Sequence, residues 1–298
     1  MTASILETAT SPRTVTEPPV RRRHRRFRTG SRVLDLVLLL LGLLMVSPLV
    51  WLISTSLTAA GSAFALPPTW IPTPFTVQNF AGVSQLIPFG EMFLNSLVVA
   101  SLSTLGALTT STLAAYAFSR LRFRGSGVLF VGILSALMVP VQLTVIPVFI
   151  MMRTLHLIDT LAALVLPLLV NVFDIFFLRQ YFNSIPLELD EAARIDGAGH
   201  LWILFRMLVP LSGPAIAALV ILNFQAAWND YFGPLIFLNS PQHMTLPIGL
   251  VTLQAGQGGG PAVVVFAAIT LVVLPVLVLF LVFQRSFVSS IAQSGIRG

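Results

Sequence analysis

Charged residues are scarce in this 298-residue chain, and cysteine is absent. Only 9% of the residues are charged, against about 25% in an average soluble domain. Without cysteine, disulfide frameworks and thiolate metal sites are excluded. Hydrophobic residues make up 56% of the chain, and they gather in runs of roughly 20 or more, the length that a bilayer requires. This composition is typical of an integral membrane protein.

Lysine is also absent, because all 17 basic residues are arginine. A Walker A loop needs its lysine to hold nucleotide phosphates, and a pyridoxal enzyme needs one for its Schiff base. We therefore expect no cofactor in this chain and no enzymatic activity, since no catalytic set and no metal-ligand spacing is present. The net charge of +6 does not indicate nucleic-acid binding, because the arginines lie beside apolar runs and are not interleaved with aromatic residues.

Six long apolar segments predict an all-α integral membrane protein with six transmembrane helices. At about 1.5 Å per residue each can cross roughly 30 Å of hydrocarbon. The predicted spans are residues 33–57, 91–119, 127–152, 160–182, 211–238 and 262–284. The first is too long for the apolar region of a signal peptide, about 7 to 15 residues, and is therefore expected to be retained.

Arginine placement gives these spans a direction. Sixteen of the 17 arginines fall at the N-terminus, at the C-terminus, or in the connections that follow the second and fourth spans. Only Arg153 falls on the other side, where residues 58–90 and 239–261 carry no charge if His243 is neutral. Short cytoplasmic loops retain arginine, so both termini are expected to be cytoplasmic.

The N-terminal residues 1–32 are predicted to be a disordered basic cytoplasmic tail, separate from a transmembrane domain at 33–298. Prolines and the arginine-rich stretch at residues 21–28 cannot bury a core. We interpret the stretch either as a topology anchor or as a site for specific lipid recognition. Each arginine near an anionic leaflet contributes about 1 kcal/mol, which suffices for anchoring.

The connection at residues 183–210, here called the elbow, combines both charge signs with helix signals. Ser184 is a candidate N-cap with Pro186 in the first turn. Asp190 and Arg194 have the spacing of an i, i+4 ion pair. Gly197 is expected to end the helix. We predict a short two-helix turn that projects into the cytoplasm.

The elbow resembles the permease subunits of binding-protein-dependent ABC importers, whose signature is E-A-A, three residues, glycine, nine residues, and I-x-L-P. The signature residues present here in register are Glu191, Ala192, Ala193, Gly197 and Pro210. Met207 and Val209 replace the isoleucine and leucine, and both replacements are apolar. The phrase from Glu191 through Asp196 to Ala198 is similar to the carbohydrate subgroup, the relatives of the maltose and glycerol-phosphate permeases. Weaker matches include Ala115-Tyr-Ala-Phe-Ser-Arg120.

The resemblance implies that the elbow couples the spans to a separate ATPase. The implied coupling residues are Glu191, Ala192, Ala193, Asp196 and Gly197. It also implies a second permease subunit in a heterodimer, a dimer of cytoplasmic subunits that bind ATP and Mg, and an extracytoplasmic solute-binding protein. The implied solutes are sugars, related polyols and glycerol phosphates, and the implied location is the inner membrane of a bacterial cell.

The fifth predicted span concentrates polar side chains, which are costly in a bilayer and usually face protein or water. They are Asn223, Gln225, Trp228, Asn229 and Asp230. The spacing of seven between the first and last predicts a single helical stripe toward the bundle interior. An indole with amides and a carboxylate suits sugar recognition along a translocation path. The same cluster also fits a structural hydrogen-bond network between two permease subunits.

A stand-alone, ion-coupled secondary transporter is the alternative function. Such proteins commonly show two similar halves and a coupling-ion carboxylate. Asp230 and Asp174 could supply the carboxylate, but no internal repeat is evident. Asp174 lies near the end of the fourth span, and this position favours a structural carboxylate whose hydrogen bonds are satisfied within the protein.

Overall fold

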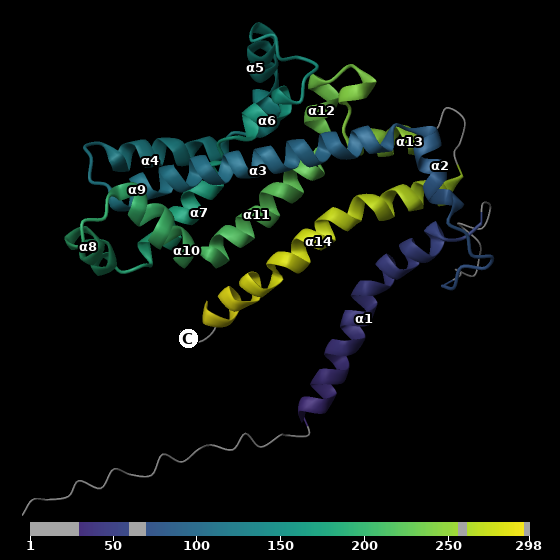
Figure 1. The fold of residues 1–298 in the computed structure, drawn as a ribbon, viewed down its shortest axis with the longest axis horizontal. Coiled ribbons are helices and arrows are strands. Elements are labelled where there is room, and N and C mark those ends of the chain that lie inside the picture. Colours follow the sequence, from purple (N-terminus) through teal and green to yellow (C-terminus); the bar gives the residue numbers. More distant parts are fainter. Residues whose placement is uncertain (1–29, 60–69, 256–260, 295–298) are drawn as a thin grey trace, which may run out of the picture. The chain divides into compact units, whose positions relative to one another are not determined.

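The computed structural model describes residues 30–59, 70–255 and 261–294, and every regular element in these ranges is a helix (Figure 1). The predicted all-α class is thus confirmed for the described residues. The predicted tail at residues 1–32 lies almost wholly outside them. Contacts divide the chain into two units, residues 1–48 and residues 49–298.

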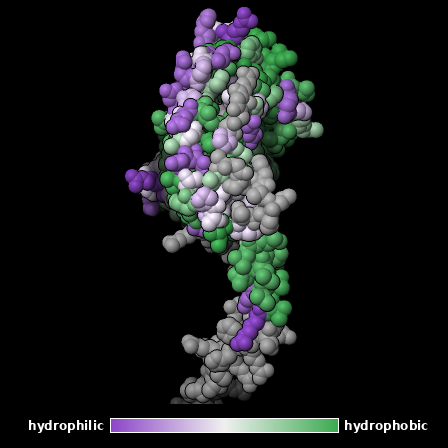
Figure 2. Space-filling model, turned by 90° about the vertical axis from the view of Figure 1, so that its right-hand side faces the viewer, coloured by the Kyte–Doolittle hydropathy of each residue, from purple (hydrophilic) through white to green (hydrophobic). Residues whose placement is uncertain are grey.

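Helix α1 (Gly30–Ser56) supplies the described part of the first unit and follows the predicted first span. Leucine and valine occupy all sides of it, and large apolar side chains from Val33 to Met45 are exposed. Their colour in Figure 2 is the green of hydrophobic residues. A helix that is apolar all round is typical of a membrane span.

The second unit contains sixteen further helical segments among its described residues. Their bounds are α2 (Gln78–Leu86), α3 (Phe89–Arg120), α4 (Ser126–Ser135), η1 (Ala136–Met138), α5 (Val141–Thr154), α6 (Ala162–Leu168), α7 (Val172–Asn183), α8 (Leu187–Ile195), α9 (His200–Trp202), η2 (Ile203–Leu208), α10 (Val209–Leu211), α11 (Gly213–Trp228), α12 (Phe232–Phe237), η3 (Pro241–His243), α13 (Leu246–Ala255) and α14 (Ala262–Ser294).

Helix α3 is the central element of this unit and packs against α6, α7 and α11. Its buried positions recur every three or four residues and carry mostly small side chains. Among them are Ser96, Ala100, Ser103, Ala107, Ser111 and Ala115. Small side chains at this spacing form one helix face and let neighbouring backbones approach closely, as in helix pairs within membranes.

Four helical stretches are long and apolar enough to cross a membrane, or six if each of two bent pairs counts as one span. The bends correct the third and fifth predicted spans. The third bends by 102° between α4–η1 and α5. The break falls at Pro140, whose ring disfavours helical backbone at the preceding residue, and Val139 is indeed extended. The fifth predicted span begins at a bend of 82° between residues 200–211 and α11, and α11 ends at Trp228 instead of reaching residue 238.

The fourth predicted span is interrupted between α6 and α7. Asn171 caps α7 by accepting hydrogen bonds from the backbone N–H groups of Phe173 and Asp174. Two hydroxyl groups of α3 satisfy carbonyls at the break: Thr110 donates to Leu169, and Ser111 donates to Asn171 at 3.2 Å. The interruption therefore leaves few backbone groups without partners, which an apolar surrounding requires.

Three buried apolar clusters hold the second unit together. One lies around Trp228 and joins α2, α3, α11, α13 and α14. Another lies around Leu204 and joins α3, α7, η2 and α11. The last, around Met152, joins α3, α5, α6 and α12. The elbow is thus packed on the second cluster, and the walls of the cavity described below include the third.

Candidate functional site

The elbow contains the first candidate site, and helix α8 is its exposed element. Ser184 is not the N-cap, because Pro186 precedes the helix and the Ser184 hydroxyl donates to the Tyr181 carbonyl at 2.7 Å. The predicted end at Gly197 is confirmed. Gly197 has φ +86°, and the backbone N–H of Ala198 donates to the Ala193 carbonyl at 2.9 Å. This is the bond of a Schellman turn, whose left-handed residue is usually glycine.

One face of α8 is fixed to the end of α3 by a buried ion pair. Arg120 Nε lies 3.1 Å from Asp190 Oδ2, and the two side chains are 2% and 4% exposed. The N–H is poorly aligned for a hydrogen bond, so the contact is best described as an ion pair. A second guanidinium nitrogen donates to the Ile185 carbonyl at 2.9 Å. Asp190 therefore pairs with Arg120 and not with Arg194, the partner expected from i, i+4 spacing.

Two further contacts hold the surroundings of the elbow. The Tyr116 hydroxyl on α3 lies 3.0 Å from Nδ1 of His200, the first residue of α9. Arg179 on α7 donates to the Phe118 carbonyl at 3.2 Å and stacks over the Phe130 ring at 4.1 Å. The end of α3 is therefore tied to both sides of the exposed helix.

The predicted coupling residues lie mostly on the surface of the elbow. Glu191, Ala192, Asp196 and Gly197 are exposed, whereas Ala193 is half-buried against the cluster around Leu204. Glu191 also lines a polar cavity of about 500 Å³ between α8 and the end of α3. Among the large apolar side chains of the elbow, Ile195 is the most exposed, at 87%.

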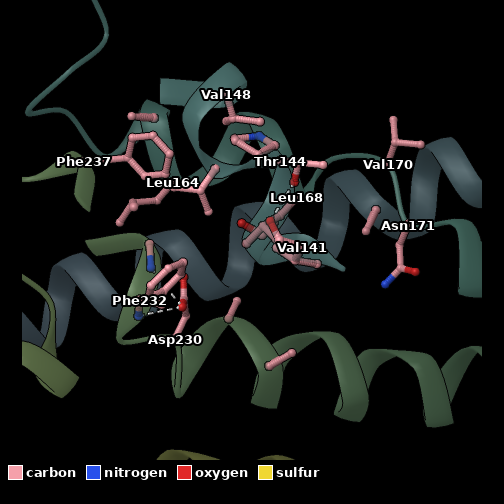
Figure 3. Close-up of a pocket in the computed structure, with 18 of the residues that line it drawn as sticks. Val141, Thr144, Val148, Leu164, Leu168, Val170, Asn171, Asp230, Phe232 and Phe237 are labelled. Atoms are coloured by element: carbon pink, nitrogen blue, oxygen red, sulfur yellow. Dashed lines mark hydrogen bonds between the residues drawn. The ribbon is translucent and has the colours of Figure 1, made fainter. Parts of the chain in front are cut away.

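The second candidate site is a cavity of about 560 Å³ (Figure 3). Its walls come from α3, α5, α6, α11 and α12, together with residues at the α6–α7 break. Most of the lining is apolar, and its polar members are Ser103, Thr144, Asn171, Asn223 and Asp230. A largely apolar pocket of this size with a few placed polar groups is typical of small-molecule sites.

Two of these polar groups belong to a hydrogen-bond network that crosses from the α6–α7 break to α11. Asn171 Nδ2 donates to Asn223 Oδ1 at 3.0 Å, and Asn223 Nδ2 donates to Asp174 Oδ2. Asp174 is 1% exposed. The predicted structural carboxylate at Asp174 therefore has the amide partner that burial requires.

The single helical stripe predicted for the fifth span is wrong, because α11 ends before Asp230. Asn223 and Asp230 both line the cavity, but Asp230 lies past the helix end. Trp228 is 1% exposed and donates its indole N–H to the Val272 carbonyl at 3.1 Å. Gln225 and Asn229 are exposed elsewhere on the unit.

Comparison with known proteins adds to this geometry. Residues 107–293, which include the elbow and most of the cavity wall, match the family described as binding-protein-dependent transport system inner membrane component. The chain belongs to this family. It is accordingly a multi-pass membrane protein, and the family resemblance carried by the elbow is confirmed.

Several relatives of this permease resemble it over most of their length. It is 36% identical over 208 residues to the arabinooligosaccharides transport system permease protein AraQ of Bacillus subtilis, covering 70% of this chain and 74% of AraQ. It is 35% identical over 277 residues to the sn-glycerol-3-phosphate transport system permease protein UgpE of Yersinia pestis, covering 90% and 98%. A solved bacterial ABC transporter for import of the acidic polysaccharide alginate contains a chain with a TM-score of 0.76 and 26% identity, covering 89% of this permease and 100% of that chain.

Sequence reasoning missed the side chains that anchor the elbow of this permease. Tyr116 and Arg120 stand in the segment Ala115-Tyr-Ala-Phe-Ser-Arg120, which the sequence marks only as a weak match. A tyrosine and an arginine closing a long apolar helix were the available signal. Their partners, His200 and Asp190, are about 70 to 84 residues away in sequence, so no local pattern could pair them.

Removing one member of the buried pair should destabilise the permease strongly. In Arg120→Ala, Asp190 keeps its charge in a buried position without a cation, and such a loss costs about 3–5 kcal/mol. Thermal unfolding in detergent should show a clear drop in midpoint. Arg122→Ala is the matched control because Arg122 is exposed. Equal midpoints for the two variants would contradict the role of the pair, and Arg120→Met with Asp190→Leu should recover much of the loss.

Proposed function

We propose that this permease is one membrane subunit of an ATP-driven importer and that a separate cytoplasmic ATPase docks on its elbow. The observation that carries the proposal is the construction of α8. One face is anchored on α3 through the buried Arg120–Asp190 pair, while the opposite face is exposed. A helix held in this way can pass the movement of a docked partner into the bundle as a rigid element.

The exposed face of α8 defines the docking surface in this proposal. Glu188, Ala192 and Ile195 are spaced i, i+4 and i+7, so they share one side of the helix, and all three are exposed. Ala192 permits close approach, and Ile195 offers an apolar side chain to a cleft. Glu191 and Asp196 flank this face and supply charge, while Gly197 sets the turn that follows.

The predicted topology supports a cytoplasmic elbow, on the same side of the membrane as the proposed ATPase. The proposal takes the chain as six spans, with each bent pair counted as one, and with both termini cytoplasmic. The asymmetry of sixteen arginines against one supports this orientation. In this arrangement residues 183–210 form the coupling loop, and residues 1–32 form a basic tail beside the membrane lipid.

The proposed partners are a second permease subunit in a heterodimer, a dimer of ATPase subunits that binds ATP and Mg, and an extracytoplasmic solute-binding protein. The names of AraQ and UgpE support a sugar, or a related polyol or glycerol phosphate, as the solute. Membership of the importer family disfavours the alternative of a stand-alone secondary transporter. In the proposed path, Asn223 and Asp230 line the cavity, whereas Gln225, Trp228 and Asn229 do not.

Purification of the assembled complex tests this function. The unaltered permease should co-purify with an ATPase and support ATP-driven solute uptake in proteoliposomes. Ile195→Asp should lower both the ATPase yield and the uptake by about tenfold, because it places a charge in the docking surface. Its fold should be unaffected since Ile195 is 87% exposed. Ile195→Leu keeps the apolar contact and serves as the control, and uptake that does not require ATP would refute the proposal.

A further inference from the structure

The cavity beside α11 has an unusual balance of charge. Among the 22 residues that line it, one is ionisable: Asp230. The arginines of the described second unit lie elsewhere. Arg120 pairs with Asp190 of the elbow, and Arg179 contacts Phe118 and Phe130. Neither Arg153 nor Arg206 lines the cavity. A solute in this cavity therefore meets a carboxylate and neutral amides and hydroxyls, with no cation from the residues that the structure describes.

The Asp230 side chain is fixed with one oxygen left available. Oδ1 accepts the backbone N–H groups of Phe232 at 3.1 Å and Gly233 at 3.2 Å, as the dashed lines in Figure 3 show. Oδ2 accepts no hydrogen bond from any described residue. Gly233 leaves room for this oxygen, because a Cβ there would lie 2.5 Å from it. The two backbone donors therefore hold Oδ1 in place, and Oδ2 is free to accept a hydroxyl.

A second carboxylate deepens the negative character of the same region. Asp174 lies behind Asn223 and accepts its amide, so the amide oxygen of Asn223 is turned toward Asn171. Asn171 in turn directs its own oxygen at the start of α7. These amides are therefore committed and cannot reorganise to bind an anion without breaking the network. An anionic solute would lose hydration here without gaining a counter-charge, which is strongly unfavourable.

Neutral, hydroxyl-rich solutes fit this wall better. Asp230 Oδ2 can accept a sugar hydroxyl in a charge-assisted hydrogen bond. Phe232 and Phe237 also line the cavity, and aromatic faces pack against the apolar faces of sugar rings. Ser103 and Thr144 add hydroxyl groups that can both donate and accept.

We propose that the cavity is a solute subsite that admits neutral sugars and excludes phosphorylated or acidic ones, with Asp230 as the residue that determines this specificity. The inference rests on the proposed importer function and narrows its solute class. It predicts that this permease does not carry glycerol phosphate, the solute in the name of its relative UgpE.

Equilibrium binding to the purified complete complex tests the subsite directly. The probes are arabinotriose as the neutral sugar, and sn-glycerol-3-phosphate and digalacturonate as the anions. The unaltered complex should bind arabinotriose saturably and neither anion. Asp230→Asn should weaken arabinotriose binding by about tenfold or more, since hydrogen bonds to charged groups contribute about 1.5–3 kcal/mol. The same variant should reduce the difference in affinity between the neutral and the anionic probes.

Matched variants separate specificity from folding. Asparagine can still accept the two backbone N–H groups, so Asp230→Asn preserves the turn, and Asp230→Glu should keep anion exclusion. Asn229→Asp adds the same charge one residue away, off the cavity wall, and should leave the binding of all three probes unchanged. Anion binding by the unaltered complex, no saturable arabinotriose binding, or an unchanged profile in Asp230→Asn would overturn the proposal. ATP-driven uptake by the same preparation would then still support the importer function.

Discussion

Replacing Gly197 by valine is expected to lower ATP-driven uptake by about five- to thirtyfold, while the same replacement at Gly199 leaves it nearly unchanged. Gly197 has φ +86°, whereas Gly199 has φ −77° and ψ 165°. An L-residue in the left-handed region costs roughly 1–2 kcal/mol, and a β-branched residue there is a genuine outlier. A cost of that size reduces the population of the native turn by about five- to thirtyfold.

Steric crowding does not explain the expected difference, because a Cβ at either glycine would meet no atom within 4 Å. The two sites therefore differ in backbone conformation alone, two residues apart on the same exposed loop. Uptake into proteoliposomes and ATPase activity of the same complexes should be measured together. The expected signature is ATPase that no longer responds to solute, since the turn orients α8 relative to α9.

A graded series sharpens this test. Asparagine visits the left-handed region more readily than other non-glycine residues, so Gly197→Asn should retain more uptake than Gly197→Val. If Gly199→Val is as damaging as Gly197→Val, the loop is sensitive to bulk and the backbone argument fails. If all three variants transport normally, the elbow does not couple the spans to an ATPase.

The sequence predicts both the membrane class and the elbow well, but the physical reason differs between the two. Long apolar runs are a one-dimensional signal. Accordingly, α1 and α3 lie within a few residues of the predicted spans 33–57 and 91–119, and α14 begins at the predicted residue 262 but continues ten residues beyond 284. The elbow was visible because a short motif with fixed spacing includes Gly197, whose left-handed backbone only a few residue types adopt easily.

The interruptions of the spans were not predicted, because hydropathy is insensitive to them. Pro140 was a local signal for the bend after η1, but Asn171 acts through partners 60 and 52 residues away, Ser111 and Asn223. The end of α11 is similar. Asp230, two residues after Trp228, turns its carboxylate to the next backbone N–H groups and begins a new segment, so counting seven residues along one helix was misleading.

Trp228 illustrates how this break changes the interpretation of the fifth span. Assigned to a path, the indole would face the solute. In the structure it stacks on Phe224 with ring centroids 5.5 Å apart and meets Phe93 edge-on at 5.6 Å. Its N–H donates to the Val272 carbonyl of α14. These contacts join α3, α11 and α14, so the side chain belongs to the core.

Trp228→Ala should therefore lower stability by about 3–5 kcal/mol, the usual cost of emptying a buried aromatic site. Denaturant unfolding of the purified permease measures this, with Trp202→Ala as the control because Trp202 is 53% exposed. Trp228→Phe keeps most of the ring packing and loses the hydrogen bond to Val272, so it should cost only about 0.5–1.5 kcal/mol. A Trp228→Ala protein with normal stability and altered solute preference would show instead that the indole faces the translocation path. If Trp228→Ala instead lowers stability and leaves solute preference unchanged, Asn223 and Asp230 are the members of the predicted stripe that face the cavity. The reason is that Trp228, at the end of α11, packs into the core before the chain continues to α12.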